Sequence, residues 1–487
     1  MTSPTRLLRR LLTGVLAVGM LLPSPPPLAV EQDLPVMGDT ASGIISRQQE
    51  HELGRAWLRA FRSRVDTLDD PVLQSYVENL LYDLVVHSEL QDRRLELILI
   101  NNPSMNAFAV PGGVIGLHTG LFRFAENEDQ LASVVAHELA HLSQRHFARR
   151  LEAQKKTSLG TMAGLLAGII LAATAGGDAG MAAMTMTQAA ALESQLRYSR
   201  QNEQEADRQG MRTLYESGRD PGAVAEMFER MMAATRYTGR RPPEFLLTHP
   251  LTEKRVADAR NRINNYPARQ YPADPRYAMM RARAQLHMDN SPQRSIQRFS
   301  SELEGHSLSR DAARYGLALA LSEDGRHQEA WQTLQPLLDK EPKNLVVQLA
   351  AATLESNRKR YDEALARLEE LERLHRNNYA LLRTKAEVLL KASRYQASER
   401  ILETLSRLRP NDPEVWFQLA EVSGLAGDIT GVHKARAEYY ILTGVFDKAR
   451  EQLQYAQRLV QNDFRQRAVI EERLRELKAL EERTAKL

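Results

Sequence analysis

Two histidines and a glutamate stand in the order H-E-x-x-H within an apolar stretch of the chain, as His137, Glu138 and His141. Four residues make about one turn of an α-helix, so His137 and His141 project from one face and can bind a single metal ion. Glu138 projects about 100° away, where it can reach a water on that metal without being a ligand. Such a site requires a third ligand and a cleft for substrate.

Two purely structural histidines in a buried helix are the alternative. A chance H-E-x-x-H in a chain of this length has a probability of roughly one or two per cent. The surrounding Val134, Val135, Leu139 and Leu142 predict a mostly buried helix. Buried imidazole and carboxylate groups cost free energy unless they are satisfied, and a metal ion satisfies them. The pattern therefore favours a zinc site.

A second predicted helix, Arg197–Glu216, carries carboxylates that could complete the site. Glu203 and Asp207 lie one turn apart on one face. One of them can bind the metal while the other holds a ligating histidine through its distal nitrogen. Glu205 faces elsewhere and is expected to be solvated, although spacing alone does not choose between Glu203 and Glu205.

His249 precedes Pro250, which predicts an extended backbone at the histidine. A lone histidine is more often structural than functional, so both roles remain open from the pattern alone.

A small sheet is predicted upstream of the H-E-x-x-H helix. Leu95–Ile100 has the composition of a strand, and Met105–Val110 and Val114–His118 flank a Pro-Gly-Gly turn. A strand beside a catalytic helix can pair with an extended peptide, which is how many proteases bind a substrate backbone. A hairpin that only packs against the helix is the alternative. Residues 45–90 are predicted to be helical.

Composition limits the function classes. A chain of 487 residues predicts two or three domains, and 43% hydrophobic residues suffice for proper cores. A net charge of +3 without a basic block argues against nucleic acid as a partner. Because the chain has no cysteine, it has no disulfide and no thiolate ligand, which leaves His, Asp and Glu to bind metal.

Residues 1–29 have the organisation of a secretory signal peptide. Arg6, Arg9 and Arg10 precede the apolar run Leu11–Leu22, and a proline-rich boundary follows. Pro27 stands where a small residue is expected at a cleavage site, so retention of the segment as an anchor is the alternative.

The segment Thr157–Leu192 has an unusual composition. It contains a single charged residue, Asp178, and no aromatic residue, and a glycine-rich break divides it. A helical hairpin packed over the active site is the favoured interpretation. A membrane contact that dips into the surface and a pair of spanning helices are the alternatives.

The C-terminal half repeats with a period of 34 residues. The alanines that share one phase of this period are Ala284, Ala318, Ala352, Ala386 and Ala420. This period, with small residues where paired helices touch, is typical of tetratricopeptide repeats. The phase slips after about residue 428, and a charged helix over 462–487 is expected to cap the array.

The predicted fold class is therefore mainly α. An α+β peptidase domain with a small sheet is expected over residues 40–265, and an α-solenoid of tetratricopeptide repeats over residues 266–487. The signal peptide precedes both.

These motifs together resemble the gluzincin family of zinc metallopeptidases that includes HtpX and the CAAX prenyl endoprotease. The resemblance covers the chain from roughly residue 40 to its end. Besides the H-E-x-x-H helix, the matching segments are Asn106–Gly113, Ser199–Asp207 and Thr248–Pro250 with Arg255.

The resemblance implies one zinc ion per chain, held by His137, His141 and Glu203. Glu138 is then the general base, and Asp207 supports a ligand from behind.

For the remaining motifs, the resemblance implies that His249 lies near zinc and blocks or regulates the fourth coordination position. Arg255 is expected to support the ligands from outside. The residues implied to bind substrate on the edge strand are Asn106, Ala107, Phe108 and Ala109.

The resemblance also implies a periplasmic metalloendopeptidase with a chaperone-like role. It would assist the assembly of outer-membrane β-barrel proteins and degrade misassembled ones, and its repeats would contact the β-barrel assembly machinery. Residues 157–192 are the candidate for a peripheral membrane contact. The alternative is a repeat-based binding scaffold whose peptidase site is normally latent.

Overall fold

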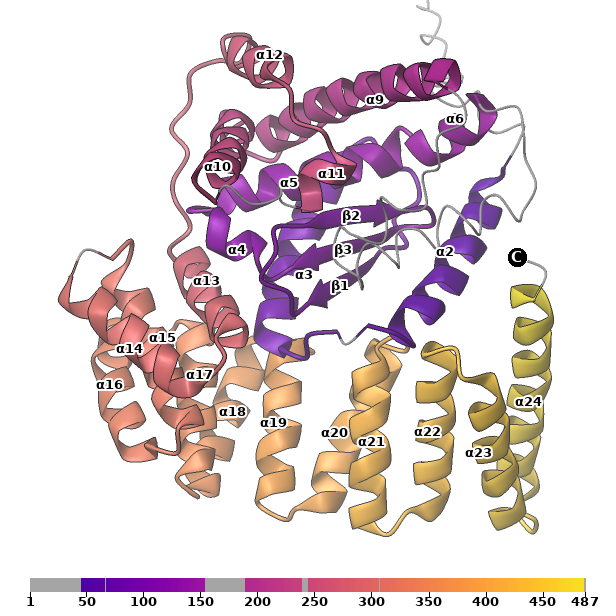
Figure 1. Ribbon diagram of the computed structural model, residues 1–487. Coiled ribbons are helices and arrows are strands. Elements are labelled where there is room, and N and C mark those ends of the chain that lie inside the picture. Colours follow the sequence, from indigo (N-terminus) through magenta and orange to yellow (C-terminus); the bar gives the residue numbers. More distant parts are fainter. Residues whose placement is uncertain (1–44, 66, 154–188, 239–243, 306, 486–487) are drawn as a thin grey trace, which may run out of the picture. The chain divides into compact units, whose positions relative to one another are not determined.

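The structure is a computed structural model that describes residues 45–65, 67–153, 189–238, 244–305 and 307–485 (Figure 1). One compact unit runs from Ala41 to Leu487 and contains all of them. The expected signal peptide and the expected hairpin as far as residue 188 lie outside these ranges. Within the described ranges, no helix is long and apolar enough to cross a membrane.

The fold is mainly helical around a small sheet, as the sequence predicts. The strands are β1 (Glu96–Ile100), β2 (Ala107–Val110) and β3 (Val114–His118), in the order β1-β3-β2. β3 pairs in parallel with β1 and antiparallel with β2, so β2 is an edge strand. Gly112 and Gly113 turn the chain between β2 and β3 with φ of +82° and +83°, a conformation that glycine adopts without strain.

Two N-terminal helices flank the sheet. α2 (Arg47–Arg62) begins at Ser46, whose side chain forms a capping box with Gln49. α3 (Pro71–Val86) begins at Asp70, whose carboxylate accepts the Val72 and Leu73 N–H groups. Aromatic contacts fix α2 on the sheet, because the Phe108 ring of β2 lies 5.7 Å from that of Trp57 and 6.0 Å from that of Phe61. The apolar side of β2 is therefore buried.

The H-E-x-x-H stretch lies in α5 (Glu128–Ser143), which Asn127 caps. α5 packs along α9 (Ala189–Glu216). At Gly210 of α9, an added β-carbon would lie 3.3 Å from the His137 backbone nitrogen, so glycine permits this close approach. α9 begins eight residues earlier than predicted, and its first turn includes residues expected in the hairpin. The other helices around this pair are α4 (Leu121–Phe124), α6 (His146–Ala153), α10 (Ala223–Thr238), α11 (Glu244–Thr248) and α12 (Glu253–Ile263).

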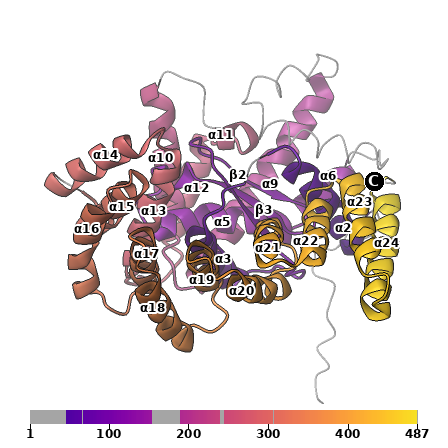
Figure 2. The ribbon, with the colours of Figure 1, turned by 90° about the horizontal axis from the view of Figure 1, so that it is seen from below.

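Paired helices form the C-terminal half, and consecutive helices lie side by side in Figure 2. The five alanines at the 34-residue period are between 0% and 4% exposed, so each lies at a helix contact. The helices are α13 (Pro275–Met288), α14 (Pro292–Glu304), α15 (Arg310–Glu323), α16 (His327–Lys340), α17 (Leu345–Asn357), α18 (Tyr361–Leu374), α19 (Tyr379–Lys391), α20 (Tyr395–Leu408), α21 (Pro413–Ala426), α22 (Ile429–Leu442), α23 (Phe446–Leu459) and α24 (Phe464–Thr484).

One backbone feature follows the same period. Gly325, Lys359, Ser393 and Gly427 stand 34 residues apart, each in the turn between two helices, and their φ values are +79°, +62°, +59° and +90°. The left-handed turn is therefore repeated with the array, whether or not a glycine occupies it.

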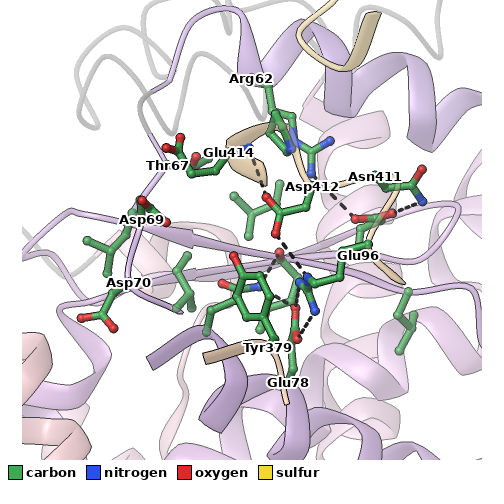
Figure 3. A pocket seen from close by; sticks show the side chains of 18 of the residues that line it. Arg62, Thr67, Asp69, Asp70, Glu78, Glu96, Tyr379, Asn411, Asp412 and Glu414 are labelled. Atoms are coloured by element: carbon green, nitrogen blue, oxygen red, sulfur yellow. Dashed lines mark hydrogen bonds and ion pairs between the residues drawn. The ribbon is translucent and has the colours of Figure 1, made fainter. Parts of the chain in front are cut away.

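Polar pairs join the repeats to the sheet and its helices, and Figure 3 shows the pair of Glu96 with Asn411. The pairs are Asp70 with Arg283 (2.6 Å), Asp69 with Arg383 (2.8 Å), Glu78 with Arg409 (2.6 Å) and Glu96 with Asn411 (2.7 Å).

Asp70 is the most buried carboxylate of these pairs, with a side chain that is 1% exposed. It caps α3, accepts from Arg283 and contacts the His287 ring at 2.7 Å. Burial opposes its ionisation, but Arg283 and His287 together hold the pKa of Asp70 well below its usual range.

Asp70→Ala is expected to lower the free energy of unfolding by about 3–5 kcal/mol, because it leaves a buried guanidinium unpaired. The stabilisation by the ionised Asp70 carboxylate is complete above about pH 3.9, the pKa of aspartate in the unfolded chain. It is lost as the pH falls below that value. Chemical denaturation of the full chain measures it. Asp362→Ala removes a carboxylate that is 86% exposed and serves as the control, with an expected change within about 0.5 kcal/mol. Equal changes in both variants would contradict the prediction.

Candidate metal centre

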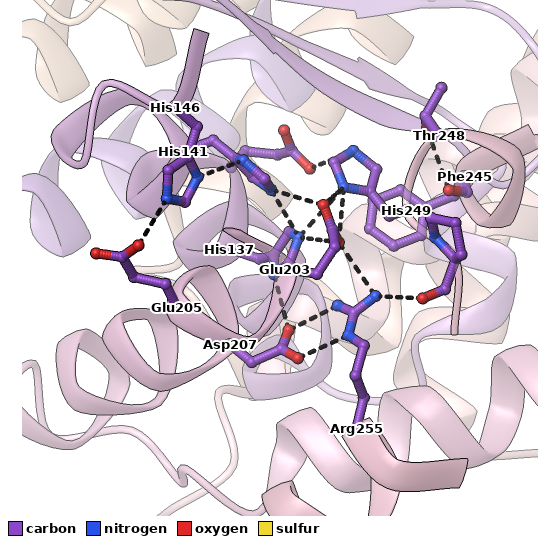
Figure 4. A network of polar contacts seen from close by, with 12 residues as sticks. His137, His141, His146, Glu203, Glu205, Asp207, Phe245, Thr248, His249 and Arg255 are labelled. Carbon is purple, nitrogen blue, oxygen red and sulfur yellow. Dashed lines mark hydrogen bonds and ion pairs between the residues drawn. The ribbon is translucent and has the colours of Figure 1, made fainter. Parts of the chain in front are cut away.

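α5 and α9 bring two imidazoles and one carboxylate together (Figure 4). Glu203 Oε2 lies 3.4 Å from His137 Nε2, and Glu203 Oε1 lies 3.5 Å from His141 Nε2. The two histidine Nε2 atoms are 3.1 Å apart. With His249, one ligand atom from each of the four residues lies within 4.8 Å of the others. The three sequence-predicted ligands and His249 thus converge on one point.

Asp207 and Arg255 support this cluster from behind. Asp207 Oδ1 accepts from His137 Nδ1 at 3.0 Å, and Arg255 donates to both oxygens of Asp207 at 2.7 Å. Arg255 Nη1 also lies 3.1 Å from Glu203 and donates to the Pro250 carbonyl at 2.9 Å. One buried guanidinium therefore holds the supporting carboxylate, the ligating carboxylate and the loop of His249.

Electrostatics keep these carboxylates ionised. Burial opposes the charge of Asp207, yet hydrogen bonds from Arg255 and His137 lower its pKa. Burial likewise opposes the charge of Glu203, but His249 and His137 hold its pKa well below the usual range. Ionised carboxylate is the form that binds a cation.

A support for His141 was not predicted from the sequence. His146, at the start of α6, places Nδ1 at 2.9 Å from His141 Nδ1, and its Nε2 lies 3.3 Å from Glu205 Oε2. Glu205 also accepts from Arg149 at 3.0 Å. The expectation that Glu205 is merely solvated was wrong, because the carboxylate is one end of a chain that leads to His141. The only available signal was a histidine five residues beyond His141.

These contacts assign a consistent proton to each ring. The His137 Nδ1–H donates to Asp207, which leaves the His137 Nε2 lone pair toward Glu203 and His141. If His146 Nε2–H donates to Glu205, then His146 Nδ1 accepts from His141 Nδ1–H, and the His141 Nε2 lone pair also faces inward. Two lone pairs 3.1 Å apart repel each other unless a cation lies between them.

The arrangement fits a divalent metal ion. Imidazole nitrogens and a carboxylate are ligands that zinc accepts. Glu138 lies next to the cluster with a side chain that is 1% exposed. Its Oε1 has no hydrogen-bond partner among the described residues, which suits a group that acts on a water or a substrate. Burial raises the pKa of Glu138, which makes its carboxylate a stronger proton acceptor.

His249 follows α11, a short helix that the sequence did not predict. Its Nδ1 lies 3.1 Å from Glu203 and its Nε2 lies 3.5 Å from Glu138 Oε1. The Phe245 ring stacks on the imidazole with a centroid distance of 4.7 Å. Glu244 and Phe245 fix the start of α11, because Asn106 Nδ2 donates to Glu244 at 3.4 Å and the Phe245 N–H donates to the Met105 carbonyl.

The edge of β2 that is not paired with β3 lies beside Glu138 and the metal cluster. The His118 N–H donates to the Asn106 carbonyl, and β2 pairs with β3 as Phe108 with Gly116, so the backbone groups of Ala107 and Ala109 point away from β3. The Ala109 N–H lies near enough to Glu138 to lower its pKa. Asn106, Ala107 and Phe108 are buried and Ala109 is half-buried, so Ala109 is the accessible position of this part of the edge.

A cavity of about 80 Å³ opens beside His141 and the end of β2. Leu90, Leu142 and Phe147 contribute apolar walls, and Glu50 and Arg145 also line it. Its position beside the ligand and the strand suits a side chain of a bound peptide.

Comparisons with known proteins agree with this geometry. Residues 71–263 match peptidase family M48, and residues 357–421 match a tetratricopeptide repeat family. The chain is 37% identical over 455 residues to the β-barrel assembly-enhancing protease of Escherichia coli (strain K12), covering 92% of each chain. The protein of the same name from Yersinia pestis is 33% identical over 483 residues, covering 98% of this chain and 97% of that one. The mitochondrial metalloendopeptidase OMA1 of Schizosaccharomyces pombe is 32% identical over 182 residues, covering 37% of this chain and 50% of that one.

His146→Ala is expected to lower metal affinity by about 10–100-fold, because His141 loses the group that orients its ring. Competition with a chromophoric chelator on the full chain measures this affinity without any turnover. His433→Ala, which removes an imidazole that contacts Gln452 at 2.8 Å in the repeats, is the control and should bind metal as the wild type does. Wild-type affinity in His146→Ala would show that the imidazole does not orient His141.

Proposed function

The chain belongs to peptidase family M48 and is a metallopeptidase, and from this premise we propose that it is a zinc endopeptidase of the periplasm. Its substrates would be unfolded or misassembled outer-membrane β-barrel proteins, whose assembly it would also assist. The observation that carries the proposal is the buried Glu138 carboxylate beside two imidazoles and Glu203, with one oxygen that has no hydrogen bond to the described residues.

His137, His141 and Glu203 would hold the zinc ion, with Asp207 and Arg255 as supporting residues. Two nitrogens and one carboxylate oxygen leave a coordination position for the reaction. When bound, zinc lowers the pKa of a water toward about 7 and polarises a carbonyl group.

Glu138 would carry the proton transfers. Its carboxylate accepts a proton from the attacking water and returns it to the leaving amine. The raised pKa that burial causes suits both halves of this cycle. The Ala109 N–H keeps the carboxylate beside the strand where a peptide would lie.

In the segment Asn106–Ala109, which would bind substrate by strand addition, Ala107 and Ala109 would pair with the peptide, and Asn106 and Phe108 would hold the strand on β3. An extended peptide can pair with the free backbone groups of β2 without regard to its sequence. This mode suits a peptidase that acts on unfolded chains, and the small cavity beside His141 would add a preference for one side chain.

His249 would act as a removable fourth ligand. Its imidazole is held by Glu203, stacks on Phe245 and lies within reach of Glu138. In that position it excludes a water, so the site would be latent until α11 moves. A latent peptidase agrees with the alternative function, in which the repeats act mainly as a binding scaffold.

The setting of the protein is likewise a proposal. Residues 1–29 would direct export, residues 40–265 would form the peptidase domain, and residues 266–487 the repeat domain. The names of the relatives support a role in β-barrel assembly, and tetratricopeptide repeats support binding to other proteins, for which the β-barrel assembly machinery is the proposed partner. The segment 157–192 remains the candidate lid or peripheral membrane contact.

Glu138→Gln is expected to retain one zinc per chain and to cleave unfolded protein about 10²–10⁴-fold more slowly, because the general base is lost. Metal analysis and a cleavage assay on one preparation measure both quantities. Glu421→Gln alters an exposed carboxylate in α21 and is the control. A correctly folded wild type that binds no metal would refute the proposal. A Glu138→Gln protein that fully replaces the wild type in cells would favour the scaffold function.

His249→Ala is expected to raise proteolysis, because it removes the ligand that closes the site. The cleavage rate should rise more than about tenfold if His249 leaves the fourth coordination position free in fewer than one wild-type molecule in ten. Thr248→Ala is the matched control, since the Thr248 hydroxyl donates to the Phe245 carbonyl at 3.1 Å and touches none of the metal ligands. Slower cleavage by His249→Ala would instead make the imidazole a donor to the reacting substrate.

A further inference from the structure

A second cavity lies where α2 meets the last repeats, away from the metal centre. It has a volume of about 530 Å³. α2 contributes one wall, and Ile441, Leu442 and Arg473 from the end of the array contribute another. At this junction, an added β-carbon on Gly444 would lie 3.3 Å from the Arg59 side chain, so the two walls are in contact.

The α2 wall carries basic side chains at helical spacing. His51, Arg55 and Arg59 follow one another every four residues and therefore share one face, and Arg62 continues that face. Like charges at this spacing destabilise a helix. Buried ring and guanidinium nitrogens of the first three, namely His51 Nδ1, Arg55 Nε and Arg59 Nε, have no hydrogen-bond partner among the described residues.

Acidic groups compensate these cations only in part. Glu96 is 3.0 Å from Arg55 and 3.7 Å from Arg62, so one carboxylate serves two guanidiniums. Figure 3 shows the contact between Arg62 and Glu96. Asp412 is the next acid near Arg62, and it also contacts Arg409 at 3.2 Å, which is itself bound to Glu78.

Arg59 has no ion-pair partner in the part of the chain that the structure describes. Its Nη2 donates to the Thr484 hydroxyl at 3.2 Å, and its guanidinium lies 6.0 Å from the centre of the Phe446 ring. Burial and the nearby Arg55, Arg483 and Arg62 lower the pKa of Arg59 to about 10, so it remains charged at neutral pH. A half-buried charge without a partner of opposite sign costs free energy, which a bound anion would recover.

The other basic residues of the cavity are already paired. Arg473 donates to both oxygens of Glu438 at 2.7 and 2.5 Å, and Arg94 lies 2.6 Å from Asp92. Of the three guanidiniums of α2, Arg55 and Arg62 share Glu96, and Arg59 has no carboxylate partner among the described residues.

We propose that this cavity binds a phosphate monoester through Arg55, Arg59 and Arg62. A phosphate monoester carries about 1.5 to 2 negative charges at neutral pH, whereas a carboxylate carries one, so the phosphate is attracted more strongly to three neighbouring guanidiniums. Guanidinium groups bind phosphate through paired hydrogen bonds. The cavity is larger than a phosphate group, and Leu58, Ile441 and Leu442 offer apolar contact to an organic remainder. The proposal is independent of proteolysis.

The test is isothermal titration of the full-length, metal-loaded protein with glycerol phosphate at constant ionic strength, with acetate for comparison. The wild type should bind glycerol phosphate at least about tenfold more tightly than acetate. Arg59→Gln should weaken the binding at least about tenfold, because the unpaired guanidinium is lost. Arg64→Gln removes an exposed arginine just after α2 and should bind as the wild type does.

Vesicles distinguish a soluble ester from a lipid. Co-sedimentation with vesicles that contain phosphatidic acid, but not with phosphatidylcholine vesicles, and its loss in Arg59→Gln would assign the phosphate to a lipid headgroup. Binding of glycerol phosphate without co-sedimentation would assign it to a soluble ester.

The unfolding temperature of the Arg59→Gln variant provides a second test, because the proposal predicts the direction of its change. Without ligand, Arg59→Gln should unfold at the same temperature as the wild type or a higher one, because the repulsion by Arg55 and Arg62 disappears. A lower unfolding temperature with unchanged phosphate binding would overturn the proposal. Phosphate binding that persists fully in Arg59→Gln would also overturn it, since the anion would then lie elsewhere, as at the metal centre.

Discussion

The crossing of α5 and α9 is the constraint on which the metal centre depends. It removes Glu203, Asp207 and Arg255 from water almost completely, together with His137. Charges in such an environment persist only when each has a partner at hydrogen-bond distance. Arg255 fulfils this condition for two carboxylates at once, and Asp207 fulfils it for an imidazole. Gly210 allows the helices to approach closely enough for these contacts.

Much of this site follows from local sequence. Helical spacing places His137 and His141 on one face and Glu203 and Asp207 on another, and the 34-residue period locates the repeats. The support by His146 depends instead on a break between α5 and α6, where Arg145 adopts a φ of +50°. No periodicity encodes that break, so neither His146 nor the role of Glu205 could be derived. α11 was also missed, because a helix of five residues leaves too short a pattern to detect.

Two basic regions of the molecule differ in how their charge is balanced. At the metal centre, Arg255 forms ion pairs with the carboxylates of Glu203 and Asp207, so its positive charge is balanced by the protein itself. Along α2, Arg55 and Arg62 share Glu96, and Arg59 has no ion-pair partner among the described residues. Sequence spacing shows the row of basic residues, but only the packing of α22 and α24 against it reveals that the row is enclosed.

The left-handed turns of the repeats have a consequence for how the array tolerates change. Lys359 and Ser393 adopt a backbone conformation that costs about 1–2 kcal/mol for residues with a β-carbon, whereas Gly325 and Gly427 adopt it freely. Glycine in turn loses more conformational freedom when the chain folds. At the central turns, the backbone strain of Lys359 and Ser393 in the folded protein is therefore partly offset, because these residues lose less conformational entropy on folding than glycine does. The two kinds of residue are therefore nearly interchangeable at these corners, and whole helical pairs could be inserted or removed there without a new turn having to evolve.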